Sequence, residues 1–501
     1  MYDYPSAQDA FIAVLDELGK GNAWQSGLQL NDKDAEQPVA DSGEKVDREN
    51  DAEASSEKAA AQSGRDVALL DDTFHAMRLS FYYTGGVADI ANLLARQGDR
   101  HYAPRLYADL GELYLSKKRF RDGADTYVAF VESYPLSAYA PRFSVSRISA
   151  FAMGDFPNEV RAEKQAFAER YSVTGEYWQQ AEEPSRQYVK GQLRVYINEL
   201  AAYYHGLAQQ KKSQLSASAS LAARAEVVDL YRQAGNWYQA WIDSFPNEPD
   251  LANTWFLLGE TRFESNDFRD AVAAYENAAY GYNSFTKANE AGYAALLSYD
   301  RVLSDIQRRQ AMMQADLAVS QSLHEEYAKW QLSRIDSALL FAETFQSDPR
   351  RIPILAQTAE TVYELKDFER TIDVADRLIA AVGDDHEWRL KGYLLKGHAY
   401  MDMQQFASAE TAYEYALGAQ QALLPTLMPS SREYLDLVDQ YQQTLENYAA
   451  SIYKQGELAN AAGDPELAAQ TFLRVVERAP DSQIRVTAQY DAAVLVMKTV
   501  Q

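Results

Sequence analysis

Apolar residues recur at intervals of three and four along almost the whole chain, in segments of about 12 to 20 residues. Proline and glycine lie between these segments rather than within them, where helix boundaries are expected. No stretch alternates apolar and polar residues as a half-buried strand would. The pattern therefore predicts an all-α fold.

One arrangement of aromatic and small residues repeats along the chain. In its clearest copy, within residues 106–135, a first helical segment is followed by a break, a second segment and a proline. The residues that define this copy are, in order, Tyr107, Leu110, Gly111, Tyr114, Phe120, Tyr127, Phe130 and Pro135. Further full or partial copies lie in residues 193–246, 255–275, 355–371, 397–413 and 456–480. Repetition in register predicts an array of helical hairpins.

This arrangement resembles the tetratricopeptide repeat, a helical hairpin of about 34 residues. In that family a small residue stands at position 8, aromatic residues at 17 and 24, alanine at 20 and proline at 32. Here position 8 corresponds to Gly111, Gly259, Gly397 and Gly456. The resemblance implies a tetratricopeptide-like α-solenoid, a right-handed superhelix of roughly eight or nine hairpins. It also implies that the small residues at positions 8 and 20 face each other across each hairpin.

The ends of the chain and one internal segment depart from this array. Residues 1–30 are predicted to form half a hairpin, a second helix without its first. Residues 31–66 contain many acidic and no aromatic side chains, which predicts an acidic disordered linker. Residues 67–501 form the predicted solenoid, which ends in a first helix without its second, and insertions at 210–225 and 304–329 enlarge two hairpins. The half hairpins indicate a piece of a longer protein, or ends that self-associate with another copy.

Several repeat junctions have an aromatic–Pro pair followed by a polar or small segment, as in residues 130–143 and 241–260. This feature is similar to bacterial envelope tetratricopeptide proteins of the BamD and CpoB (YbgF) type. That second resemblance implies a periplasmic scaffold, tethered to the outer membrane in the full-length protein. The cytoplasm is the second choice of location.

Charge and composition narrow the function classes. The 501 residues carry a formal net charge of −25, which argues against nucleic-acid binding, because phosphate contacts need clustered Lys and Arg. The chain has no cysteine, which excludes disulfides and thiolate metal sites. It also has no run of about 18 apolar residues that would insert into a membrane.

No catalytic or metal-binding pattern emerges. Asp384, Asp385 and His386 come nearest to a metal-ligand cluster, but their place just before a helix favours capping by an aspartate. The pair Gly85-Gly86 lacks the Lys-Ser/Thr that follows a phosphate loop. The sequence therefore predicts a protein that is not an enzyme and that needs no cofactor or metal.

The family builds its concave groove from positions 2, 5, 9 and 12 of each first helix. The residues that the resemblance places there, and that we predict to bind a protein partner, are Arg105, Glu112, Asn253, Phe256, Glu260, Lys391, His398, Tyr453 and Glu457. Members that clamp a carboxylate use Lys and Asn in this groove, whereas this chain has Glu112, Glu260 and Glu457. A groove of acidic and apolar residues favours a basic or apolar peptide.

The sequence supports three hypotheses for the function. The first is a non-enzymatic interaction scaffold of the bacterial envelope that binds a peptide or protein through the groove. The second is a cytoplasmic tetratricopeptide adaptor, and the third is the non-catalytic region of a larger enzyme or export machine. The full-length gene product would separate them, because a signal peptide with a lipidated cysteine supports only the first.

Overall fold

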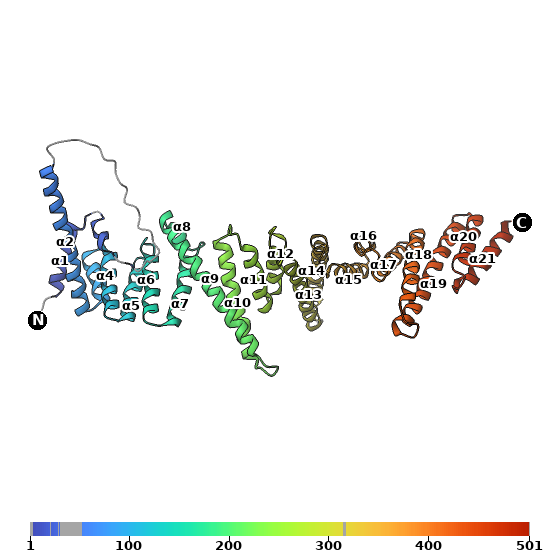
Figure 1. The fold of residues 1–501 in the computed structure, drawn as a ribbon, viewed down its shortest axis with the longest axis horizontal. Helices are drawn as coiled ribbons and strands as arrows, with labels where there is room; N and C mark the ends of the chain where they lie inside the picture. Colours follow the sequence, from blue (N-terminus) through green and yellow to red (C-terminus); the bar gives the residue numbers. More distant parts are fainter. Residues whose placement is uncertain (1–3, 21, 29, 31–52, 314–316, 500–501) are drawn as a thin grey trace. The chain divides into compact units, whose positions relative to one another are not determined.

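The computed structural model describes residues 4–20, 22–28, 30, 53–313 and 317–499. The described residues are predominantly helical and contain no strand. Within each part of the chain, helices pack mainly against their neighbours in sequence (Figure 1). The predicted all-α class and the tetratricopeptide-like α-solenoid are both confirmed.

The chain divides into two compact units, of which the first comprises residues 1–266. Its described elements are eleven α-helices and one short 3-10 helix: α1 (Tyr4–Leu18), η1 (Ala23–Gly27), α2 (Glu53–Tyr83), α3 (Val87–Gln97), α4 (Ala103–Ser116), α5 (Phe120–Ser133), α6 (Ala140–Met153), α7 (Pro157–Arg170), α8 (Glu176–Gln180), α9 (Glu183–Gln214), α10 (Leu221–Ser244) and α11 (Leu251–Glu264).

The second unit comprises residues 267–501. Its described elements are α12 (Phe268–Tyr280), α13 (Ala288–Met312), α14 (Leu317–Thr344), α15 (Arg351–Glu364), α16 (Phe368–Ala381), α17 (His386–Asp402), α18 (Phe406–Leu423), η2 (Leu424–Thr426), α19 (Arg432–Ala461), α20 (Pro465–Arg478) and α21 (Ile484–Thr499).

The two helices of a hairpin approach most closely at the glycine of position 8. A Cβ atom added to Gly111 would lie 2.3 Å from Cε1 of Tyr127, and one added to Gly397 would lie 2.5 Å from Cε1 of Tyr413. The aromatic ring of position 24 thus covers this glycine. A Cβ atom added to Gly123, at position 20, would lie 3.3 Å from the carbonyl oxygen of Gly111, so the small residues of positions 8 and 20 approach each other in this hairpin as predicted. The bare glycine backbone gives the ring a flat surface to pack on.

The turn inside a hairpin holds one residue in the left-handed backbone conformation. The residues with this conformation at such turns are Lys118, Asp155, Asn266, Lys366, Gln404 and Gly463, with φ between 57° and 81°. Only Gly463 adopts it without a steric penalty. Recurrence of one turn geometry at corresponding places supports the repeat frame independently of the aromatic residues.

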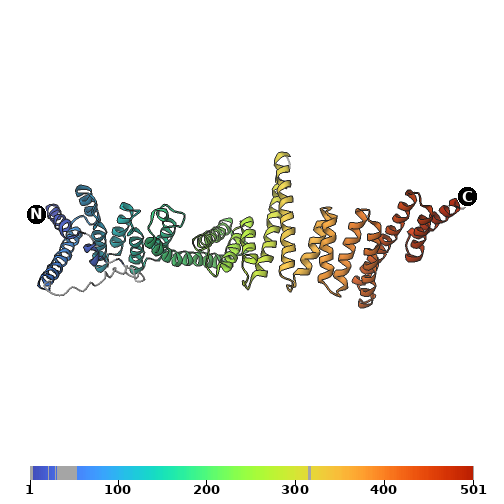
Figure 2. The ribbon, with the colours of Figure 1, turned by 90° about the horizontal axis from the view of Figure 1, so that it is seen from above.

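Two hairpins are longer than their neighbours. In the first unit, α9 and α10 extend past the adjacent helices and join at residues 215–220 (Figure 1). In the second unit, α13 and α14 have 25 and 28 residues and project in the same manner (Figure 2). Both lie where the sequence predicted enlarged hairpins.

The N-terminal region differs from the sequence prediction. Residues 31–52 of the predicted disordered linker (residues 31–66) lie outside the described residues. From Glu53 onward, the chain forms the first turns of α2. Alanine, lysine and glutamate in this stretch are strong helix formers, which accounts for a helix that starts before residue 67. The half hairpin predicted in residues 1–30 contributes α1, whose Ile12 and Leu15 are buried against α2.

Candidate functional site

Arg105 of α4 belongs to the packing of the first unit rather than to a solvated groove. Its side chain is buried, Nη2 donates to Oδ1 of Asp71 on α2 at 2.7 Å, and Nη1 donates to the carbonyl of Trp24 at 3.2 Å. The guanidinium also lies over the ring of Phe74, 4.1 Å from its centroid. These contacts fix α4 against α2 and η1, so we remove Arg105 from the binding surface.

Glu112 lies two turns further along α4 and is half-buried. Burial raises its pKa, while the nearby Arg78 opposes that shift. Asp109, which the sequence analysis did not single out, is buried on the same helix, between Arg105 and Glu112 in sequence. Its Oδ2 lies 3.5 Å from Nε of Arg105. Burial raises the pKa of Asp109 to about 6 in spite of the arginines. This carboxyl is therefore poorly solvated and poorly paired.

The remaining predicted residues of the first unit lie on α11. Phe256 is buried, whereas Asn253 and Glu260 are half-buried. Burial first, and then the charge of Glu260, raise the pKa of Tyr238 to about 12. Phe256 thus acts as a packing residue, and only Asn253 and Glu260 retain accessible surface.

Lys391 and His398 of α17 both contact side chains of α15, the preceding first helix of the second unit. Nζ of Lys391 lies 2.8 Å from Oε1 of Glu360, and Nδ1 of His398 shares a 2.8 Å hydrogen bond with Oη of Tyr413. Burial lowers the pKa of His398, with Asp402 opposing it, so the imidazole is neutral near pH 7. Tyr363 of α15 lies beside His398, with ring centroids 6.3 Å apart.

Tyr453 and Glu457 of α19 lie one turn apart. Oη of Tyr453 donates to Oδ2 of Asp491 on α21 at 2.6 Å, and its ring packs on Phe472 with centroids 4.8 Å apart. The bond to Asp491 first, and then burial, raise the pKa of Tyr453 to about 12. Glu457 is exposed and lies 2.6 Å from Nζ of Lys454.

The predicted residues of the second unit lie on its first helices α17 and α19, and we treat the side of these helices that carries them as one candidate face. Leu394 and Met401 of α17 and Tyr453 of α19 are half-buried and pack against the same hydrophobic cluster. We call this face the first-helix strip, which consists of Glu360, Tyr363, Lys391, Leu394, His398, Met401, Asp402, Tyr453, Glu457 and Asp491. Arg105, Glu112, Asn253, Phe256 and Glu260 belong to the other unit.

The repeat frame also places Leu394 and Met401 at groove positions 5 and 12, but sequence reasoning missed the other four members of the strip: Glu360, Tyr363, Asp402 and Asp491. Glu360 follows Ala359 as His398 follows Gly397, so positions 9 and 12 of the weaker repeat could have supplied Glu360 and Tyr363. Asp491 had no such signal, because α21 lacks a position-8 glycine to set its frame.

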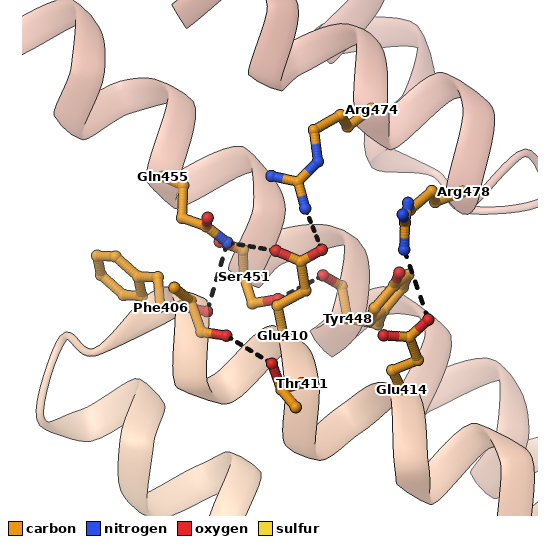
Figure 3. Close-up of polar contacts among 10 residues, drawn as sticks. Phe406, Glu410, Thr411, Glu414, Tyr448, Ser451, Gln455, Arg474 and Arg478 are labelled. Atoms are coloured by element: carbon orange, nitrogen blue, oxygen red, sulfur yellow. Dashed lines mark hydrogen bonds and ion pairs between the residues drawn. The ribbon is translucent and has the colours of Figure 1, made fainter. Parts of the chain in front are cut away.

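A cluster of polar side chains links α18, α19 and α20 (Figure 3). We call it the polar junction, and it consists of Glu410, Glu414, Gln455, Arg474 and Arg478. Glu410 of α18 is buried, and it accepts hydrogen bonds from Nε2 of Gln455 on α19 at 2.7 Å and from Nη2 of Arg474 on α20. Beside it, Nη1 of Arg478 lies 3.5 Å from Oε1 of Glu414. One buried carboxylate thus joins three consecutive helices, which keeps α19 in place against α18.

The predicted helix cap is confirmed at the start of α17. Oδ1 of Asp385 accepts hydrogen bonds from the backbone N–H of Glu387 at 3.1 Å and of Trp388 at 3.3 Å. Among the described residues, no group of three acidic or histidine side chains is arranged to hold a metal ion. Nor is any described helix long and apolar enough to cross a membrane.

Comparison with known families identifies repeats in the second unit. Models of the tetratricopeptide repeat match residues 390–422 and 450–482, which cover the hairpins α17–α18 and α19–α20. No curated protein matches the chain. The chain therefore carries tetratricopeptide repeats in these two segments, which contain Gly397 and Gly456.

Solved structures of repeat proteins also match. The C-terminal part of a TPR repeat-containing protein from Cytophaga hutchinsonii is 9% identical, with 65% of this chain and 97% of that chain covered and a TM-score of 0.23. The TPR domain of P58(IPK) is 12% identical, with 78% and 98% covered and a TM-score of 0.17. The resemblance to the BamD and CpoB type is not among these matches and stays a prediction.

Proposed function

We propose that the chain is a non-catalytic scaffold that binds a basic or apolar peptide of a partner protein along the first-helix strip. The two repeat matches support the class of function, because arrays of such repeats present extended binding surfaces. Both matched hairpins contribute their first helices to the strip.

The half-buried apolar side chains of the strip carry this proposal. Leu394, Met401 and Tyr453 are only partly covered by the hydrophobic cluster beneath them, and the carboxylates of Asp402 and Glu457 lie on the same face. A peptide that covers the apolar groups gains their remaining burial, and its basic side chains find carboxylates at the edge. An apolar centre with a charged rim is the usual composition of a peptide-binding surface.

The location follows only from the aromatic–Pro pairs at the repeat junctions. We propose the periplasm, with a tether to the outer membrane in the full-length protein. A cytoplasmic adaptor, or the non-catalytic region of a larger enzyme or export machine, remains the second candidate. Fractionation of cells that express the full-length gene separates the periplasmic from the cytoplasmic location, and the sequence of that gene shows whether a catalytic domain is attached.

A selection from a library of short peptides displayed on phage tests the binding surface. We expect the full chain to enrich peptides that combine apolar residues with Lys or Arg. Soluble copies of these peptides, measured by fluorescence anisotropy, should lose about tenfold in affinity with Tyr453→Ala, because truncation of an aromatic anchor costs more than 1 kcal/mol.

Two further variants keep this test interpretable. Tyr453→Phe removes only the hydrogen bond to Asp491 and should retain most of the affinity. Leu473→Ala alters an exposed side chain of α20 outside the strip and should have no effect. Equal affinity for the wild type and Tyr453→Ala would show that the peptides bind elsewhere.

A further inference from the structure

A cavity of about 450 Å³ lies between α14, α15 and α16 in the second unit. The residues that line it are Leu339, Ala342, Glu343, Gln346, Arg351, Leu355, Arg377, Ala380 and Ala381. Two of these helices, α14 and α16, are second helices of consecutive hairpins, whereas the strip is built from first helices. The cavity is therefore a separate site, and its ligand does not depend on the proposed function of the strip.

The floor of the cavity is apolar and its rim is polar. Leu355 and Ala342 are buried, with 1% and 3% of their surface exposed, and Leu339 and Ala381 are half-buried beside them. The rim consists of the polar lining residues, which are Glu343, Gln346, Arg351 and Arg377. Ligand pockets commonly have volumes of about 300–1,000 Å³ and combine an apolar lining with a few polar groups.

The polar junction in Figure 3 lies at the corresponding place two hairpins further along the chain, so the two places can be compared residue by residue. Arg377 lies 18 residues after Ala359, and Arg474 lies 18 residues after Gly456, so the two arginines occupy the same repeat position. Four residues further on, the junction has Arg478 where the cavity has Ala381. At the junction, Arg474 and Arg478 meet carboxylates of the preceding second helix.

The cavity lacks this filling pair. Its preceding second helix, α14, presents Leu339 and, four residues further on, Glu343, and Ala381 replaces the long arginine side chain that would reach such a carboxylate. One inter-repeat space is thus closed by ion pairs, and the corresponding one is left open with an apolar floor.

The arginines of the rim have unused donors. Nε of Arg351 donates to the carbonyl of Ala342 at 2.9 Å, and in the described part of the chain this guanidinium pairs with no carboxylate. Arg377 uses Nε toward Asp373 at 3.0 Å, an exposed pair within one helix. A guanidinium binds a carboxylate through two parallel N–H groups, and a half-buried one gains most from such a partner.

We propose that this cavity binds a peptide segment of a partner protein in which an apolar side chain lies next to an Asp or Glu. The apolar side chain fills the floor formed by Leu339, Leu355 and the alanines. The carboxylate pairs with Arg351 and Arg377. Gln346 and Glu343 supply a donor and acceptors for the backbone of the peptide.

The test uses the full chain in two parallel selections from a short-peptide phage library. One selection uses the wild type and the other uses Ala381→Arg, which places at Ala381 the side chain that α20 carries at the same repeat position. We expect the wild type alone to enrich peptides with an apolar residue next to Asp or Glu. Binding of these peptides, measured by fluorescence anisotropy, should fall about tenfold with Arg351→Gln and with Arg377→Gln.

Control variants separate loss of the site from loss of the fold. Arg377 is exposed, so Arg377→Gln removes its charge without disturbing the core. Ala407→Arg adds the same side chain as Ala381→Arg at an exposed place on α18 and should leave binding unchanged. Tyr453→Ala should also leave these acidic peptides bound.

Three outcomes would overturn the inference. The first is identical peptides from the two selections. The second is binding that is lost with Tyr453→Ala but not with Ala381→Arg, which would leave the first-helix strip as the binding surface. The third is saturable binding of N-acetylleucine, reduced by Ala381→Arg, with no enriched peptide, which would make the cavity a site for small apolar acids.

Discussion

Asp109 is a carboxyl group that the packing of the first unit removes from water. Burial raises its pKa from an ordinary value of 3.8 to about 6, which outweighs the attraction of Arg105 and Arg78. The folded chain therefore holds this proton more tightly than the unfolded chain between about pH 4 and pH 6. Because the native state binds more protons in that range, the contribution of Asp109 to the free energy of unfolding falls as pH rises.

Asp109→Asn should remove this pH dependence. We expect the variant to be more stable than the wild type at pH 7, by up to about 3 kcal/mol, and to match it near pH 4. Urea unfolding of both proteins between pH 4 and pH 7 measures the difference. Asp71→Asn, which neutralises the half-exposed partner of Arg105, is the control and should not gain stability as pH rises. A constant difference across this range would contradict the raised pKa.

The glycines of position 8 owe their place to an aromatic ring rather than to backbone conformation. Gly397 lies in a helix, and a Cβ atom there would meet the ring of Tyr413. Gly418 lies in the next helix, and nothing is within 4 Å of the Cβ that it would carry. The pair therefore isolates the effect of close packing within one hairpin.

Gly397→Leu should destabilise the chain by about 1–3 kcal/mol, because the ring of Tyr413 must move to admit the side chain. Gly418→Leu should instead raise stability slightly, because leucine has the higher helix propensity and meets no neighbour. The two melting temperatures should shift in opposite directions. A fall of the same size in both melting temperatures would show that the contact between the position-8 glycine and the aromatic ring does not account for the loss of stability.

Single residues were predicted less well than the frame that contains them. The repeat frame placed Arg105 in a groove, but α2 and η1 cover it, and neither belongs to the repeat pattern. Asp109 carried no sequence signal, because burial of a carboxyl depends on neighbours distant in sequence. His398 lies beside Tyr363 of α15, and its hydrogen-bond partner Tyr413, which comes from the other helix of the hairpin, was not predicted.

Hairpins are joined to one another by side chains as well as by apolar packing. Glu410 is buried at the junction of α18, α19 and α20 and accepts from Arg474, whereas Glu414 and Arg478 form an exposed pair nearby. A buried carboxylate that loses its partner is left poorly solvated. An exposed pair is screened by water and contributes little.

A double-mutant cycle on these pairs measures the difference. Glu410→Ala and Arg474→Ala should be coupled by about 1–3 kcal/mol in urea unfolding, because each removal leaves the other group unpaired at the junction. The matched cycle of Glu414→Ala and Arg478→Ala should show a smaller coupling. Equal coupling for both pairs would contradict the role given to burial.

The elements were predictable wherever local sequence determines them. The spacing of apolar residues located the helices, and the glycine–aromatic frame located both hairpins that the family models match. The start of α2 was missed, because the acidic composition of residues 31–66 obscured a helix-forming stretch from Glu53 onward. The cavity between α14 and α16 was also missed, because it results from the absence of a filling side chain at Ala381.

At the scale of the molecule, the two binding surfaces that we propose in the second unit differ in the ligand charge they favour. The first-helix strip presents carboxylates beside apolar side chains, and the cavity between second helices presents two arginines beside an apolar floor. A net charge of −25 attracts basic ligands over a distance and repels acidic ones. The strip is therefore favoured by the whole charge of the chain, whereas the cavity has to bind against it.

The attraction of basic ligands by the net charge can be measured as the association rate of the chain with a basic peptide. Glu112→Lys, Glu260→Lys and Glu457→Lys together change the net charge from −25 to −19, and association should be slower at low salt. The loss should shrink as salt rises, because a Debye length of about 8 Å at physiological ionic strength screens the exposed charges. Stopped-flow fluorescence with a basic peptide selected on the wild type measures both rates.

The matched control reverses only Glu112 and Glu260, which lie in the first unit. That variant should slow association through the weaker overall attraction but leave dissociation from the strip unchanged. Glu457→Lys alone should both slow association and speed dissociation, since Glu457 lies among the residues that we propose to contact the peptide. If Glu457→Lys leaves dissociation unchanged while the other two substitutions speed it, the peptide binds the first unit, and the groove residues Asn253 and Glu260 become its site.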